Sequence, residues 1–130
     1  MKKKFALIAI MAAFATPTLA DDIFGTWKTI ADDNGNSGHI KVAACGAKIC
    51  GTLIQSFDKD GNTFKSENQG KKLMWDMVSK GGSNYGGGKV WSPDRDKTYS
   101  GKLVLSGNSL NVKGCVFGVC RSGGKWKRVN

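Results

Sequence analysis

The sequence predicts an all-β protein: an antiparallel up-and-down barrel of about eight short strands. Turn signals rich in Gly, Asn and Asp recur along the chain after residue 20, and most segments between them are about nine residues long. Several segments, such as residues 99–105 and 110–115, alternate in character from one residue to the next. Alternation with period two, interrupted by turns at this spacing, is typical of hairpins. A β-sandwich or an OB-like barrel are the alternatives.

The first half of the predicted barrel contains three strands and one long connection. Residues 25–27 belong to the first strand, which the turn signal at residues 33–36 separates from the next. Residues 41–45 and 49–54 form a pair of strands around a short turn. Residues 58–70 are polar and glycine-containing, so we expect a connection there.

The second half begins with an ambiguous segment. Residues 70–79 place Leu73, Met74 and Met77 on one face of a short helix, but a strand is equally compatible with that length. Three consecutive glycines at residues 86–88 lie inside a strand-like segment and predict a bulge. The remaining strands are separated by turns at residues 81–84, 92–96, 106–108 and 117–118.

The first twenty residues have the layout of a secretory signal peptide. Three lysines at residues 2–4 precede an apolar stretch at residues 5–14, and Pro17 and small residues lead to a cleavage site after Ala20. The apolar stretch is too short to span a bilayer stably. We therefore expect residues 21–130 to form a single soluble domain, periplasmic or secreted, with no transmembrane segment.

The charge of the chain is strongly positive. The 130 residues contain 20 Lys and Arg against 10 Asp and Glu, a net charge of +10. Without residues 1–20, which carry three lysines, 17 basic and 10 acidic residues remain, a net charge of +7. An exported protein meets anionic lipid headgroups and sugars more than nucleic acid, so we expect no nucleic-acid partner. Scattered lysines are also compatible with a purely solubilising surface.

Four cysteines form two C-x4-C pairs, Cys45 with Cys50 and Cys115 with Cys120. In a cytosolic protein these pairs would suggest zinc, but export to an oxidising compartment favours disulfides. Three connectivities are possible. Local pairing is favoured because each pair brackets a turn, and a two-residue turn at 117–118 would set Cys115 opposite Cys120. We expect structural disulfides and no metal site.

The two ends of the predicted barrel carry a known pattern. Gly25 and Trp27 in the first strand, with Trp126 and Arg128 in the last, resemble the calycin pattern, in which a basic residue from the final strand covers a G-x-W tryptophan. The resemblance implies that these four residues close the barrel.

A second resemblance covers nearly the whole chain after residue 20. It is carried by residues 45–51, 88–93, 97–100, 114–115, 120–121 and 126–129. Through these segments the sequence is similar to the exported bacterial family called domain of unknown function 2147. This resemblance implies a small β fold and an exported compartment, but it supplies no catalytic residue.

Side chains for catalysis or metal binding are scarce. His39 is the single histidine, so a catalytic triad or a histidine-based metal site has one imidazole at most. Residues 58–62 with Glu67 are similar to a calcium loop, but the spacing of the glycine and the glutamate is wrong, which favours a polar hairpin loop. We predict no catalytic residue, no metal and no cofactor, and leave enzymatic activity open.

These observations favour a non-enzymatic binding module for a small apolar or anionic ligand of the cell envelope. Trp27, Trp91 and Tyr99 are candidates to line the ligand site, with core packing as the alternative role. A structural module acting through its basic surface is the alternative function. A small hydrolase using His39 or an acid pair is a second alternative. The sequence leaves the oligomeric state open.

Overall fold

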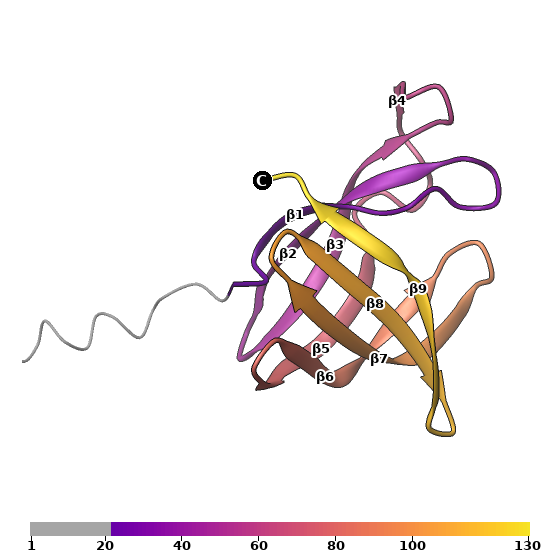
Figure 1. The fold of residues 1–130 in the computed structure, drawn as a ribbon. Helices are drawn as coiled ribbons and strands as arrows, with labels where there is room; N and C mark the ends of the chain where they lie inside the picture. The colour runs from indigo at the N-terminus through magenta and orange to yellow at the C-terminus, as the bar shows by residue number, and fades with distance from the viewer. Residues whose placement is uncertain (1–21) are drawn as a thin grey trace, which may run out of the picture.

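The computed structural model describes residues 22–130 and shows a closed antiparallel barrel (Figure 1). The predicted signal peptide at residues 1–20 lies outside the described residues. Eight strands close the barrel, and the two-residue β4 is attached to β3 outside it. The strands are β1 (Gly25–Lys28), β2 (Ser37–Cys45), β3 (Lys48–Phe57), β4 (Thr63–Phe64), β5 (Lys72–Gly81), β6 (Asn84–Ser92), β7 (Lys97–Ser106), β8 (Ser109–Val116) and β9 (Val119–Arg128).

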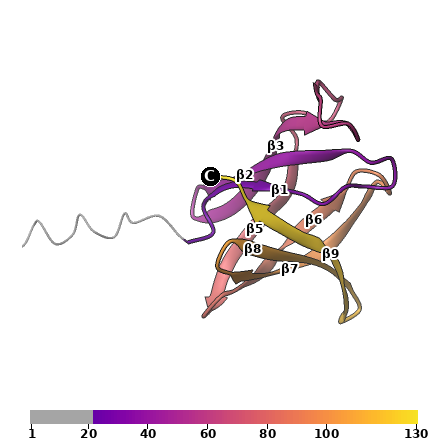
Figure 2. The ribbon, with the colours of Figure 1, turned by 45° about the horizontal axis from the view of Figure 1, so that its top comes forward.

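The topology is the predicted up-and-down barrel. Each barrel strand pairs antiparallel with the next along the chain, and β9 returns to pair with β1 through Trp27 opposite Arg128. The additional pairing of β2 with β3 joins the two ends of the sheet order and removes its open edges. Figure 2 shows the strands wrapping around a common interior. The fold prediction is therefore confirmed, and the sandwich alternative does not apply.

Side chains fill the middle of the barrel. Met74, Met77 and Leu103 are fully buried and belong to the core cluster. Glycines make room for them, because a Cβ at Gly101 would overlap the Met77 methyl group and one at Gly51 would press on Met74. The full cluster comprises Ile23, Trp27, Ile40, Val42, Ile49, Leu53, Met74, Met77, Tyr85, Val90, Leu103, Leu110, Val112 and Trp126.

Residues 70–79, for which the sequence left helix and strand open, lie mostly in strand β5. The helix-like spacing of Met74 and Met77 has a local cause. Asp76 between them adopts a left-handed φ of 58°, which interrupts the alternation so that both methionines are buried. The register between β3 and β5 shifts at the same level.

Both disulfides join cysteines within one hairpin, as the spacing predicts. Cys115 lies directly opposite Cys120, with Cα atoms 4.0 Å apart, behind a two-residue turn at Phe117 and Gly118. Cys45 and Cys50 are bridged diagonally across β2 and β3, with Cα atoms 5.8 Å apart. The bridges therefore pin the ends of two hairpins.

Candidate functional site

Arg128 at the end of β9 lies over the indole ring of Trp27 in β1. Its guanidinium carbon lies 4.3 Å from the centroid of the indole ring, a cation–π distance. The same guanidinium donates to the carbonyl oxygens of Asp22 (2.7 Å) and Phe24 (3.0 Å), and to Asn108 Oδ1 (3.1 Å). These bonds tie the segment before β1 to β9.

The other residues of the predicted closing pattern lie at the same end or beside it. Trp27 is fully buried, and its indole N–H donates to the carbonyl oxygen of Ile23 at 2.9 Å. Gly25 has a φ of 141°, and a Cβ there would overlap the Asn130 carbonyl oxygen and the Arg128 guanidinium. Trp126 is buried in the core cluster.

The three aromatic candidates for a ligand site do not share one surface. Trp27 is covered by Arg128. The indole N–H of Trp91 donates to Asp96 Oδ1 at 3.0 Å, and Lys71 Nζ lies 5.7 Å from the centroid of the ring. Tyr99 is half-buried against the core. Each of the three side chains thus has a packing or hydrogen-bonding role in the barrel.

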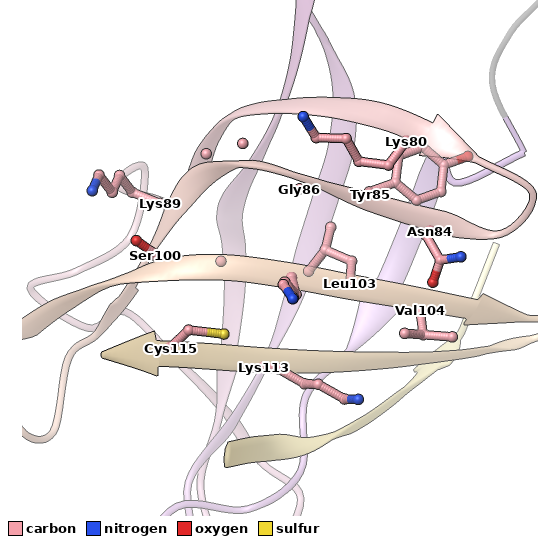
Figure 3. A pocket seen from close by; sticks show the side chains of 14 residues that line it. Lys80, Asn84, Tyr85, Gly86, Lys89, Ser100, Leu103, Val104, Lys113 and Cys115 are labelled. Atoms are coloured by element: carbon pink, nitrogen blue, oxygen red, sulfur yellow. The ribbon is translucent and has the colours of Figure 1, made fainter. Parts of the chain in front are cut away.

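A groove of about 640 Å³ lies on β5 to β8 (Figure 3). It opens on the outside of the barrel, since Lys102 is exposed while its neighbours Gly101 and Leu103 are buried. Its floor is formed where the register between β6 and β7 shifts and skips Gly86 and Gly87. The glycines predicted to form a bulge thus leave a hollow that side chains would fill.

Four lysines from four different strands line this groove, which we call the lysine groove. Lys80 comes from β5, Lys89 from β6, Lys102 from β7 and Lys113 from β8. Its lining contains no aspartate or glutamate. Like charges gathered around a hollow raise the local positive potential, which attracts anions. The lysine groove is therefore the candidate binding site.

This site is not evident from the sequence, because the four lysines are far apart along the chain. The strand register brings them together, for it sets Lys102 opposite Lys113 and Lys89 opposite Ser100. A detectable signal was present in the triple glycine beside lysines at outward positions of neighbouring strands.

His39, the residue of the hydrolase alternative, packs against an aromatic ring. Its imidazole centroid lies 4.6 Å from that of Phe57, and Lys28 Nζ lies 5.4 Å from the Phe57 centroid. Burial lowers the pKa of His39, and the positive charge of Lys28 lowers it further. Both effects favour the neutral imidazole.

The segment that is similar to a calcium loop folds as a self-capped turn. The Asp58 carboxylate accepts the backbone N–H groups of Asp60 and Asn62, both at 2.9 Å. A side chain that bonds its own backbone in this way forms an Asx turn. Between residues 22 and 130, no group of three or more His, Cys, Asp or Glu residues is arranged to hold a metal ion.

The two disulfides are typical of proteins in an oxidising environment outside the cytoplasm. Within the described part of the chain, no helix is long and apolar enough to cross a membrane.

The closed barrel defines the class of fold, which is lipocalin-like. The chain is similar to a solved structure described as "Protein HP1028 from the human pathogen Helicobacter pylori belongs to the lipocalin family", with a TM-score of 0.66, 19% identity and 84% of each chain covered. Residues 25–128 match the model of a family described as an uncharacterized protein conserved in bacteria (DUF2147). The chain belongs to this DUF2147 family, as the sequence resemblance predicts. No curated protein matches the sequence significantly.

Proposed function

We propose that residues 21–130 form an exported, periplasmic or secreted, non-enzymatic binding module for an anionic component of the cell envelope. The ligand class is a small molecule or headgroup that carries phosphate. The lysine groove carries the proposal, because four lysines line it and no aspartate or glutamate does. Lysine binds phosphate as a point charge, which suits an open groove better than a shape-matched pocket.

The outside of the barrel is a better location for this ligand than its interior. Lipocalin-like barrels of eight strands are wide enough for one small ligand inside. Here Met74 and Met77 occupy the middle of the interior against Gly51 and Gly101. A small anion in the lysine groove needs no displacement of these core side chains.

The test is a calorimetric titration of the protein with inorganic pyrophosphate at low ionic strength. We expect saturable binding that weakens as salt is added, because salt screens the lysine charges. The double variant K102Q/K113Q should bind at least about tenfold more weakly, since two of the four groove charges are lost. Lys102 is exposed, so the fold should tolerate the change.

A matched control removes two charges elsewhere. Lys41 in β2 and Lys72 in β5 are exposed and lie outside the groove lining. The K41Q/K72Q variant should keep the affinity of the unmodified protein. Equal losses in both double variants would show that net charge rather than the groove binds the anion, and would overturn the proposal, as would no binding at all.

A further inference from the structure

The β8–β9 hairpin ends in an exposed apolar tip that the core does not use. Phe117 is 101% exposed, and its neighbours Val116 and Val119 are 49% and 63% exposed. We call these three residues the apolar tip. Figures 1 and 2 both show this hairpin turn projecting beyond the adjacent strands. Contiguous apolar side chains at such a point are typical of an interaction site.

The conformation of the hairpin turn does not explain why residue 117 is a phenylalanine. Phe117 has a φ of 51° and Gly118 a φ of 80°, the left-handed pair required by a two-residue hairpin turn. Asn or Asp is favoured at the first of these positions, and a bulky residue there is an outlier. The chain therefore keeps a large apolar side chain at a position where a polar one would form the turn better.

The tip is held rigidly. The disulfide between Cys115 and Cys120 crosses the hairpin immediately behind Val116 and Val119, which pair with each other. A rigid apolar projection loses little conformational entropy when it binds.

The C-terminal part of the chain, residues 97–130, contains the tip and carries the excess positive charge. Residues 21–96 contain ten basic and ten acidic residues, so they are neutral overall. Residues 97–130, which comprise β7 to β9 and the C-terminus, contain seven basic residues and no acidic one. Arg121 is exposed one position beyond Cys120. Lys97 begins β7 at the same end of the sheet, since Ser100 lies opposite Cys115. An apolar point with these two cations near it matches an anionic bilayer, whose headgroups lie above an apolar interior.

We propose that the apolar tip inserts into the interfacial region of an anionic phospholipid bilayer, while Arg121 and Lys97 contact the headgroups. Binding is peripheral and reversible, because three side chains bury little area. This interaction goes beyond the proposed function and uses a different surface: the tip residues are not part of the lysine groove lining.

The test is co-sedimentation of the protein, residues 21–130, with vesicles of phosphatidylglycerol and phosphatidylethanolamine. Phosphatidylcholine vesicles are the uncharged comparison. The key variant is F117N, because Asn suits the left-handed φ and should preserve or improve thermal stability. We expect F117N to bind the anionic vesicles about tenfold more weakly. Pyrophosphate binding by F117N should be unchanged, which separates the tip from the groove.

A control variant removes apolar surface at another place. Ile54 in β3 is 41% exposed, and I54T keeps a β-branched side chain. It should bind vesicles as the unmodified protein does. The proposal is overturned if the unmodified protein does not sediment with anionic vesicles, if it binds both kinds of vesicle equally, or if F117N and I54T lose binding to the same extent.

Discussion

Lys102 and Lys113 lie directly opposite each other on β7 and β8, and both line the same groove. Like charges at directly opposed positions of a sheet destabilise it. An anion that neutralises this pair should therefore raise the free energy of unfolding. The arrangement links stability to ligand binding and makes the lysine groove testable even before its natural ligand is known.

Neutralising one member of this pair should stabilise the free protein. We expect K113Q to raise the free energy of unfolding by about 0.5 kcal/mol at low salt, because the cross-strand repulsion is lost. The gain should shrink as salt is added. Urea denaturation at two salt concentrations measures both effects. If K113Q were destabilising at low salt, mutual repulsion of the lysines would not be the dominant effect at this position.

The tight packing inside the barrel predicts a strong effect at Gly101. A Cβ at this position would overlap the Met77 methyl group in the core. G101A should therefore lower the free energy of unfolding by about 1–3 kcal/mol, the usual range for overpacking. Gly123 in β9 is the control, since a Cβ there meets the Val112 carbonyl oxygen at an ordinary 3.5 Å. Equal stability of G101A and G123A by thermal denaturation would mean that the interior is looser than described.

We expect that lysine cannot replace Arg128 without a loss of stability. The R128K variant keeps the charge but cannot donate simultaneously to Asp22, Phe24 and Asn108 in the fork geometry of the guanidinium. We expect it to lose about 1–3 kcal/mol of stability. The neighbouring exposed residue Lys127 provides the control K127R, which should stay within about 0.5 kcal/mol of the parent protein. Chemical denaturation that fails to distinguish the two variants would contradict the closing role.

His39 should make stability depend on pH. Burial and the charge of Lys28 lower its pKa in the folded protein, so the unfolded chain binds the proton more readily. The neutral His39 contributes fully to the free energy of unfolding above the unfolded pKa of about 6.5. This contribution is lost as pH falls below that value toward the folded pKa. Urea denaturation between pH 7.5 and 5.5 should show this loss. In H39Q the slope in that interval should be smaller, and an unchanged slope would exclude His39 as its source.

The sequence predicts the features that depend on residues close together in the chain. Turn residues and alternation predict the hairpins, and the paired cysteines around the turn at 117–118 predict the observed bridge. Residues 70–79 stayed ambiguous because the left-handed Asp76 gives strand β5 a helix-like spacing of buried methionines. The connection at 58–70 contains β4, whose two residues pair with the end of β3.

The triple glycine marks part of the lysine groove in the sequence, but the meeting of the four lysines does not follow from the sequence, for a geometric reason. Its lysines belong to four strands, and each looks like an ordinary solvated residue in its own segment. Only the register of β6, β7 and β8, with its shift beside Gly86 and Gly87, shows that they share one groove. A shift of one residue in a strand would turn its lysine to the other face.

The most direct test of the lysine groove is a two-dimensional amide NMR titration of isotope-labelled protein, residues 21–130, with inorganic pyrophosphate at low ionic strength. If the lysine groove binds the anion, we expect saturable chemical-shift changes centred on Gly86, Gly87 and Lys102, which revert when salt is added. Changes centred on another face of the barrel, or no saturable change at any amide, would contradict it.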